Sequence, residues 1–519
     1  MGGMLRTFLE CADSLCKRMK KGREIMKTRN IRLLSLLLTL IMTISLFSCS
    51  VENDSTPDAE SSSAKTSGAD LPSPDPERNE SPVPQPHDTS VSEPEDSPVE
   101  TEQRTPEYAD FVMPKETDEL TVYTTAMLGV TLSPAVEIFE KTYPGVRVTV
   151  KTLGEDEYET LIRTEIPAGQ GPDLLFSYGT DLPDIYKTVK TRLFTDLNPY
   201  FLNDPSFSRD NYVEGVLDCG LFEGSRYFVP VEYICPVLVT TEEALHDAGF
   251  TADDLLSWDS FTDTLLRYKE RSPGGDMFLT PGGVQNKSDL LDLFLYTNFD
   301  AIDYINETAS VDKDKLEKIA NAAKLYYQDK RALYLQTMIS GALAERKGLY
   351  CNELNAATDI YMKIRGLRSY GETPVFFAMP DQYDGVTAQV CSFAAAPEGA
   401  KNKRNAYRLL TVLLSEELQG GESTTGSNLR IGLPVNKNAL RGKVYGTNQQ
   451  YPDVDGEVVT EKDADALYGI LVSPSRATII PPIIKEYLQR EISPYIRGEK
   501  PWDDCCKRFQ STLELYVSE

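Results

Sequence analysis

Tyr178, Thr180 and Asp181 are the residues best placed to bind a small molecule, because they directly follow a short apolar segment expected to form a buried strand. An aromatic ring offers a flat apolar face to C–H groups, and a carboxylate accepts hydrogen bonds from paired hydroxyls. In sheets with parallel strands, ligands bind beyond the carboxyl ends of the strands. Two further predicted strand ends are candidates for the same reason, at 124–127 and 154–156. The alternative is an ordinary loop in which Tyr178 is half-buried and Asp181 is solvated.

Catalytic chemistry finds little support in the sequence. The only histidines are His87 and His246, so we expect neither a histidine-based triad nor a histidine-rich zinc site. The nine cysteines are dispersed, without a CxxC pair. An acidic segment at 453–457 departs from the spacing of a calcium loop. We therefore expect no catalytic residue, no metal and no cofactor.

The candidate binding residues must be positioned by elements that alternate between strand and helix. The first predicted elements are strands at 119–124, 146–152 and 173–176 and helices at 132–143 and 157–168. This order implies a parallel sheet with helices on its faces. Further predicted elements are a strand pair at 227–239, helix-rich sequence at 241–345, strands at 347–351 and 386–396, and helices at 404–418, 481–497 and 501–517. The roughly 400 residues after 117 are enough for two lobes rather than one core.

The N-terminal part has the pattern of a secretory signal, with basic residues before an apolar run at 33–49. This run is shorter than the roughly 20 residues that a membrane-spanning helix needs. Residues 46–49 resemble the bacterial lipobox, which implies that Cys49 is lipidated on its thiol and becomes the mature N-terminus. The alternative is an ordinary cleaved signal with a chance cysteine. Met26 would give a signal of normal length, so we expect translation to start there.

The residues between the predicted lipid and the lobes, 49–116, are expected to form an acidic, disordered stalk. Between residues 50 and 105 there are fourteen Asp or Glu against three Lys or Arg, with many Ser and Pro. The net charge of the whole chain is −27, and residues 1–48 are basic, so the rest is more acidic still. Nucleic-acid binding is excluded as a function class, because its affinity comes from basic contacts to phosphates.

Seven local segments together resemble a known family. They are FEKTYPGVRVTV (139–150), AGQGPDLLFS (168–177), YFVPVEYICPVLVTTEEALHDAGF (227–250), SWDSF (257–261), KNKRNAYRLLTVLLSEELQ (401–419), IGLPVNKNAL (431–440) and YIRGEKPWDDCCKRFQSTLELY (495–516). In this order the chain resembles the extracellular solute-binding proteins of bacterial ABC importers, the sugar-binding group that includes maltose-binding protein. The resemblance covers nearly all of 117–519, and it is specific to the family but not to a ligand.

The resemblance implies an α/β, two-lobed fold of the periplasmic-binding-protein type (type II), in which each lobe has a mixed, mostly parallel sheet flanked by helices. The N-terminal lobe would take 117–230 and 386–430, and the C-terminal lobe 236–380 and 433–519. The chain would cross between the lobes near 230–236, 380–385 and 430–434, where Pro and Gly suit backbone rotation.

The resemblance also implies a ligand-binding site between the lobes, built from residues on both sides. Tyr178, Thr180 and Asp181 would contribute from the first lobe, and Glu232 and Tyr233 from the first crossing, where a salt bridge that stabilises the hinge is the alternative. The candidates from the second lobe are Tyr296, Asn298, Tyr350, Asn352, Glu353 and Trp258. Trp258 sits between Ser257 and Asp259 and would equally suit a core position at a helix start.

These features together predict a monomeric, lipid-anchored binding protein on the extracellular face of the cell membrane. It would capture a small solute, expected to be a carbohydrate, and deliver it to ABC transporter permease subunits. Two alternatives stay open: an exported lipoprotein enzyme such as a glycosidase with a carboxylate pair, and a ligand-sensing partner of a membrane receptor.

Overall fold

The computed structural model of this chain describes residue 108 and residues 110–154, 163–271, 278–281, 291, 294–295, 301–327, 343–346, 348–352, 357–421, 432–450 and 458–519. The chain divides into two units, 1–97 and 98–519, and every element below belongs to the second. Cys49, the predicted signal and most of the predicted stalk lie outside the described residues. In the described part of the chain, no helix is both long and apolar enough to cross a membrane.

The first sheet has seven strands, in the order β14-β6-β13-β3-β1-β2 with β15 beside β13. Their bounds are β1 Glu119–Thr125, β2 Arg147–Leu153, β3 Leu174–Tyr178, β6 Val229–Ile234, β13 Thr387–Ala395, β14 Leu433–Pro434 and β15 Arg476–Thr478. Strand β1 is parallel to β2 and β3, whereas β13 is antiparallel to β3 and β6. Strands β1 and β3 are buried almost throughout, as expected for strands covered on both faces, and β2 is largely exposed. The mixed sheet confirms the predicted fold class, although its pairings are evenly divided between parallel and antiparallel and are not mostly parallel as expected.

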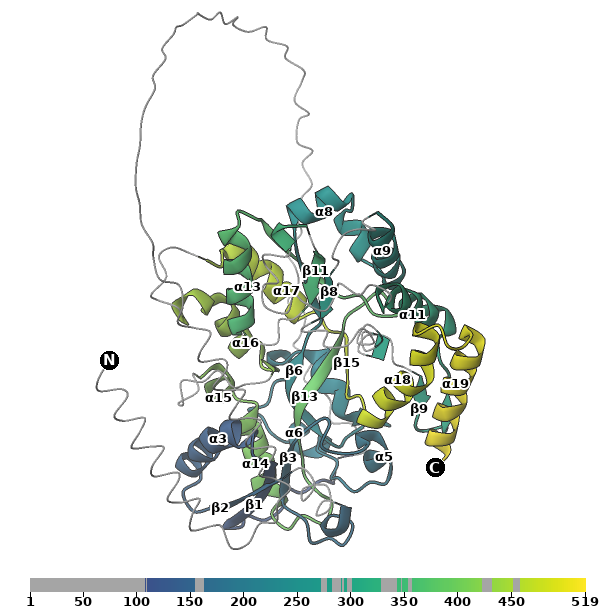
Figure 1. Cartoon of the computed structure of the whole chain (residues 1–519). Helices are drawn as coiled ribbons and strands as arrows, with labels where there is room; N and C mark the ends of the chain where they lie inside the picture. The colour runs from purple at the N-terminus through teal and green to yellow at the C-terminus, as the bar shows by residue number, and fades with distance from the viewer. Residues whose placement is uncertain are drawn as a thin grey trace, which may run out of the picture. The chain divides into compact units, whose positions relative to one another are not determined.

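The second sheet has four strands, in the order β12-β7-β11-β8. Their bounds are β7 Val237–Thr241, β8 Phe278–Pro281, β11 Gly348–Asn352 and β12 Pro374–Ala378. The helices beside it include α8 Glu242–Ala248, α9 Trp258–Arg271, α11 Lys313–Tyr327, α13 Ala357–Ser369, α18 Pro482–Ile496 and α19 Trp502–Ser518. We call the part built around the first sheet the first lobe and the part built around the second sheet the second lobe (Figure 1).

Helices α3 (Gly129–Thr142) and α14 (Lys403–Leu413) pack in one core with the first sheet, through residues such as Phe139 and Leu410. Other helices of this core are α6 Asn198–Leu202, α7 Glu214–Leu217, α13 (through Ile364 and Leu367), α15 Glu416–Gly420, α16 Lys437–Tyr445 and α17 Glu461–Leu471. The helix predicted at 404–418 is interrupted, because the Ser415 side chain accepts a hydrogen bond from the backbone N–H of Leu418 and caps a new helix.

One buried side chain joins three elements that are far apart in the sequence. The Gln419 amide, 1% exposed, donates from Nε2 to the carbonyls of Val231 (3.0 Å) and Leu413 (2.9 Å). Its Oε1 accepts from the backbone N–H of Asn436 at 2.9 Å. Gln419 thereby connects β6, the end of α14 and the start of α16.

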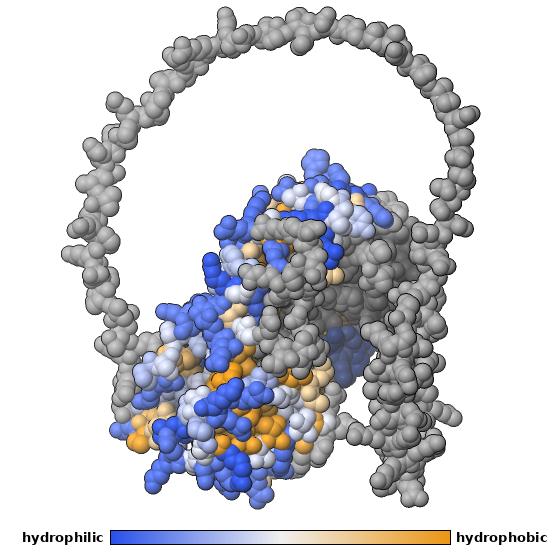
Figure 2. Space-filling view, turned by 90° about the vertical axis from the view of Figure 1, so that its left-hand side faces the viewer, coloured by the Kyte–Doolittle hydropathy of each residue, from blue (hydrophilic) through white to orange (hydrophobic). Residues whose placement is uncertain are grey.

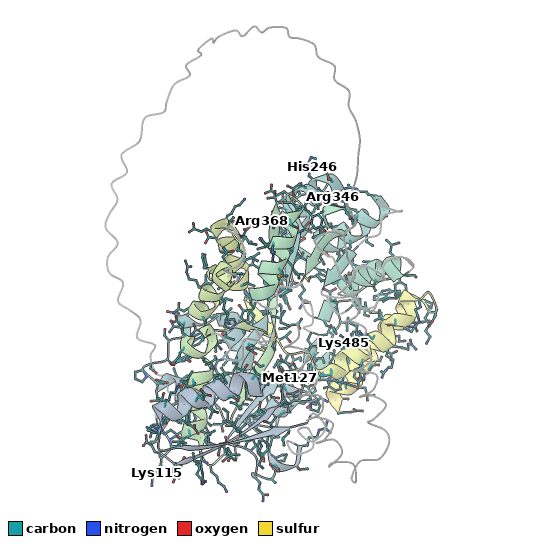
Figure 3. All side chains as sticks on the ribbon, turned by 60° about the vertical axis from the view of Figure 1, so that its left-hand side comes forward. Lys115, Met127, His246, Arg346, Arg368 and Lys485 are labelled. Atoms are coloured by element: carbon teal, nitrogen blue, oxygen red, sulfur yellow. The ribbon has the colours of Figure 1, made fainter. Side chains whose placement is uncertain are left out.

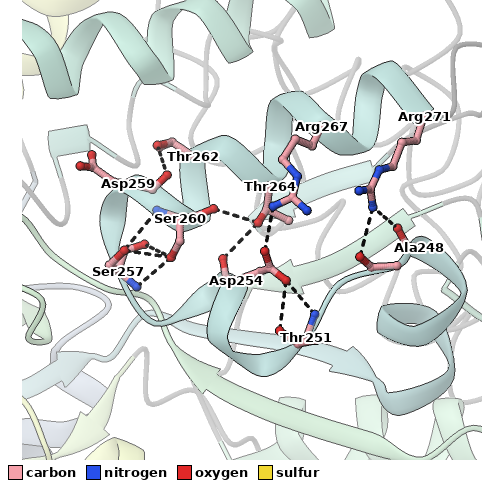
Figure 4. Close-up of polar contacts among 11 residues, drawn as sticks. Ala248, Thr251, Asp254, Ser257, Asp259, Ser260, Thr262, Thr264, Arg267 and Arg271 are labelled. Carbon is pink, nitrogen blue, oxygen red and sulfur yellow. Dashed lines mark hydrogen bonds and ion pairs between the residues drawn. The ribbon is translucent and has the colours of Figure 1, made fainter.

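The start of α9 explains the position of Trp258 (Figure 4). The Asp254 carboxylate accepts hydrogen bonds from the backbone and hydroxyl of Thr251 and pairs with Arg267 at 2.8 Å. Ser257 and Ser260 bond to each other at the first turn of the helix. These contacts fix the helix start, and Trp258, 1% exposed, packs on Phe261 in the core of the second lobe.

The outer surface of the described residues is mostly hydrophilic on the face shown in Figure 2, as expected for an acidic chain. A hydrophobic area lies on the lower part of this face. The two views differ by a turn about the vertical axis, so this lower part is the one that holds β1, β2 and β3 in Figure 1.

The chain passes between the two sheets after β6, after β12 and after β15, at 235–236, 379–386 and 479–481. The crossings expected near 230–236, 380–385 and 430–434 stay predictions. The third passage between the sheets follows β15, because β14 and β15 pair with β6 and β13 of the first sheet. Both strands are only two or three residues long, too short to show an alternating pattern.

Candidate functional site

The end of β3 is held in a fixed turn by the carboxylate of Asp181. Its Oδ2 accepts hydrogen bonds from the Ser177 hydroxyl at 2.9 Å and from the backbone N–H of Tyr178 at 2.8 Å. The turn places Tyr178 at the last position of the strand and leaves Thr180 exposed beyond it. Asp181 therefore positions the strand end, and its predicted contact with ligand hydroxyls stays a prediction.

A hollow of about 480 Å³ opens beyond this strand end, and we call it the binding hollow. Its lining residues come from both lobes and from the passages between them: Tyr178, Gly179, Thr180, Ile234, Leu295, Gln389, Val390, Cys391, Thr478, Ile479, Ile480, Pro482, Lys485, Glu486 and Gln489. Small-molecule pockets typically measure about 300–1,000 Å³, so the binding hollow has the size of a ligand site.

Helix α18 turns a mixed polar face to the binding hollow. Pro482, Lys485, Glu486 and Gln489 follow the helical spacing that puts residues on one side. On another side, Ile484 and Leu488 are fully buried in the core of the second lobe. Figure 3 shows Lys485 on this helix, with Met127 from the end of β1 also in the central part of the molecule.

Tyr178 supplies a hydroxyl that stays protonated. Its oxygen is buried and has no hydrogen-bond partner among the residues that the structure describes. Burial, followed by the nearby charges of Glu232 and Asp181, raises the pKa of Tyr178 from 10.0 to about 12. The hydroxyl is therefore protonated at neutral pH and lies near the carboxylates of Glu232 and Asp181.

Glu232 lies behind the hollow on β6 and is 2% exposed. Its Oε2 accepts a hydrogen bond from the Ser392 hydroxyl on β13 at 3.0 Å. Glu232 is absent from the lining of the hollow, which its neighbour in space, Cys391, does reach. Its negative charge acts on the site through Tyr178, whose pKa it raises.

Two other predicted ligand residues lie in hydrophobic cores. Tyr233 is fully buried, and its hydroxyl donates to the carbonyl of Leu471 at 2.6 Å. Trp258 packs in the core of the second lobe, as described above. Neither side chain lines the binding hollow, because β6 turns Tyr233 toward α17 and the capped start of α9 buries Trp258.

The remaining predicted residues of the second lobe are only partly described. Tyr350 and Asn352 lie within β11, where Asn352 pairs with Leu238 of β7. Tyr296, Asn298 and Glu353 lie outside the described residues. Leu295, which precedes Tyr296 in the chain, lines the binding hollow.

Sequence reasoning missed the contributions of β13 and α18. Gln389 and Cys391 alternate along β13 and reach the hollow together with Val390. The polar residues Lys485, Glu486 and Gln489 interrupt an otherwise apolar helix start, and this was the available signal. A polar helix face is more often solvated, so the signal alone could not assign them to a site.

Among the described residues that line the hollow, Cys391 is the one thiol. Burial, followed by the charge of Glu232, raises the pKa of the Cys391 thiol well above its usual range, so the thiol stays protonated and unreactive. His246 is 89% exposed at the far end of the second lobe (Figure 3). In the described ranges, no cluster of His, Cys, Asp or Glu could hold a metal ion.

The sequence from 123 to 420, more than half of the chain, matches the family model described as "Bacterial extracellular solute-binding protein". The chain belongs to this family of extracellular solute-binding proteins. A comparison with curated proteins gave no match.

Solved structures of such solute-binding proteins share the fold. The sugar-binding protein MalE from Xanthomonas citri is 14% identical over 77% of this chain and 97% of that chain, with a TM-score of 0.57. A family 1 protein from Alicyclobacillus acidocaldarius is 16% identical over 78% and 100%, with a TM-score of 0.53. The cyclic alpha-maltosyl-1,6-maltose binding protein from Arthrobacter globiformis is 14% identical over 78% and 99%, with a TM-score of 0.52. These matches show the type II periplasmic-binding-protein fold.

Proposed function

We propose that this solute-binding protein is anchored to the outer face of the cell membrane by a lipid on Cys49. It captures an oligosaccharide between its lobes and delivers it to the permease subunits of an ABC transporter. The observation that carries the proposal is the binding hollow, because Tyr178 and Thr180 line it from the first lobe and α18 lines it from the second.

The chemistry of the lining suits a sugar. The ring of Tyr178 and the side chains of Leu295 and Ile480 offer apolar surface to the C–H faces of a pyranose. The amides of Gln389 and Gln489 can donate to hydroxyls and accept from them. The printed names of two structural relatives, a sugar-binding protein and a maltosyl-maltose binding protein, support the same ligand class.

Capture works by closure of the lobes. A ligand shifts the balance between open and closed arrangements only by its differential affinity for them, so it must contact both lobes in the closed one. Residues of the short passage 479–481 lie between the lobes and also border the hollow, which couples occupancy of the hollow to lobe rotation.

A glycosidase is less well supported by the geometry. Hydrolysis of a glycosidic bond needs two carboxyl groups that face each other across the substrate. Among the described residues that line the hollow, Glu486 is the one carboxylate.

The test is a thermal-shift screen of the purified protein with maltose, maltotriose, cellobiose and longer glucans, next to peptides and polyamines. A ligand at 100 times its Kd stabilises the folded protein by about 2.7 kcal/mol. We expect an oligosaccharide to raise the melting temperature. A shift caused only by peptides or polyamines would overturn the carbohydrate assignment, and hydrolysis of the sugar would show an enzyme instead.

A further inference from the structure

The short helix α5 (Ile185–Lys190) joins the two lobes at a place separate from the binding hollow. It belongs to the first lobe, where Ile185 and Val189 pack with Leu175 and Phe393 of the sheet. Its cap residue, Asp184, accepts from two backbone N–H groups of the helix through Oδ1 and is only 5% exposed.

The last helix, α19, contacts α5 from the second lobe. The Tyr516 hydroxyl donates to Oδ2 of Asp184 at 2.5 Å. Lys187 donates to the backbone carbonyl of Tyr516 at 2.5 Å, and its ammonium lies 3.9 Å from the centre of the Tyr516 ring. A hydroxyl–carboxylate bond and a cation–π contact therefore link the two lobes.

A hairpin of the second lobe extends this contact. Its strands are β9 (Ile302–Asp303) and β10 (Thr308–Ala309), and Glu307 in its turn pairs with Lys190 at 2.5 Å. The Tyr304 ring packs on the Tyr186 ring with centroids 5.1 Å apart. A second hollow of about 190 Å³ lies beside this pair, and Thr478 and Ile479 line both hollows.

The binding hollow and the contact between α19 and α5 lie on opposite sides of helix α18. Because each residue turns a helix by about 100°, Pro482, Lys485, Glu486 and Gln489 share one arc of about 100°, facing the binding hollow. Tyr487 lies roughly 150° from the middle of this arc. There its ring packs on the Tyr516 ring, with the ring centroids 5.7 Å apart, and the Tyr516 hydroxyl bonds to Asp184.

The passage at 479–481 lies at the N-terminal end of α18, between the two sides. A rotation that carries the Lys485 face toward Tyr178 must carry Tyr487 and Tyr516 away from α5, because α18 and α19 pack in one core. Closure by rotation about this passage would therefore break the contacts of Tyr516 with Asp184 and Lys187.

We propose that Asp184, Lys187 and Tyr516 form an interlobe latch that opposes closure and so lowers ligand affinity without touching the ligand. They are positioning residues, and the ligand part of the test rests on the proposed function. Apparent affinity is reduced by the fraction of protein that is able to close, so weakening the latch raises that affinity.

The test compares Tyr516→Phe and the double variant with Lys187→Met against Tyr407→Phe in the full chain. Tyr407 makes a matched bond, donating to Asp204 at 2.8 Å, but both partners lie in the first lobe. One readout is the distance between two spin labels, measured without ligand. The labels are attached to ketone-bearing residues that replace Glu140 on α3 and Asp263 on α9, both of which are exposed. The other is the Kd for the oligosaccharide found in the screen.

We expect the latch variants to shift the ligand-free distance distribution and to bind about two- to tenfold more tightly, since one net hydrogen bond is lost from the open state. Tyr407→Phe leaves both readouts unchanged. An unchanged distribution or weaker binding in the latch variants overturns the proposal. A shifted distribution without binding of any sugar supports the latch and contradicts the proposed function, so the two failures are distinguishable.

Discussion

At the scale of single residues, Tyr178 combines a ring at the edge of the binding hollow with a hydroxyl whose pKa burial raises to about 12. We expect Tyr178→Ala to weaken oligosaccharide binding by up to about tenfold, because an aromatic contact contributes about 0.5–1.5 kcal/mol. Tyr370→Ala, an exposed tyrosine outside the hollow, is the control. Equal affinity in both variants, measured by calorimetry, would show that the hollow is not the ligand site.

The raised pKa of Tyr178 also predicts a pH effect on stability. The folded state holds the proton more tightly than the unfolded chain, whose tyrosine pKa is near 10.0. Its contribution to stability is therefore fully present below pH 10 and lost as the pH rises toward 12. In this pH window, the free energy of unfolding of Tyr178→Phe, measured by chemical denaturation, should fall less steeply with pH than that of the unmodified protein. Identical slopes would contradict the shift.

Gln419 provides a residue-scale test of the first lobe. Its amide satisfies two backbone carbonyls and one backbone N–H inside the core. A buried group left without its partner costs about 1–3 kcal/mol, so we expect Gln419→Leu to lower the free energy of unfolding by at least that amount. Gln510→Leu, in the partly exposed last helix, should cost less in the same urea titration.

At the scale of elements, the start of α9 depends on Asp254. Burial raises the pKa of Asp254, but hydrogen bonds from Thr251 and Arg267 outweigh it and leave the pKa below its ordinary value. The carboxylate thus stabilises the fold above the unfolded pKa, and this contribution disappears as the pH falls through the folded pKa. We expect Asp254→Asn to lose about 1 kcal/mol at pH 7 and little in strong acid. The exposed neighbour variant Asp253→Asn should match the unmodified protein at both pH values.

Elements with long, regular patterns were predictable from the sequence, and short or interrupted ones were not. The strands β1, β2 and β3 and the helices α18 and α19 lie within two residues of their predicted bounds, because each carries a clear apolar period. Helix α3 begins at Gly129, before the predicted start, and contains Pro134. The site was only partly predictable: Tyr178 and Thr180 follow from the strand-end rule, whereas Lys485 and Gln389 come to the hollow through tertiary packing that no local pattern records.

At the scale of the whole molecule, the proposed anchor makes one clear prediction. In cells fed an alkyne fatty acid, the unmodified protein should carry the label and sediment with membranes. Cys49→Ser should abolish labelling, because no thiol remains at that position to be acylated. Persistent labelling of this variant would place the lipid elsewhere, and an unlabelled native protein would show an ordinary signal.

Strand β13 has a consequence for the order in which the protein is made. It lies between β6 and β3 in the first sheet, yet its residues, 387–395, follow every strand of the second sheet in the chain. The first lobe therefore cannot complete its core during synthesis until most of the second lobe has emerged. Pairings so distant in sequence fold slowly. Delayed folding keeps the new chain extended for longer, which is the state in which a membrane translocation channel can thread it.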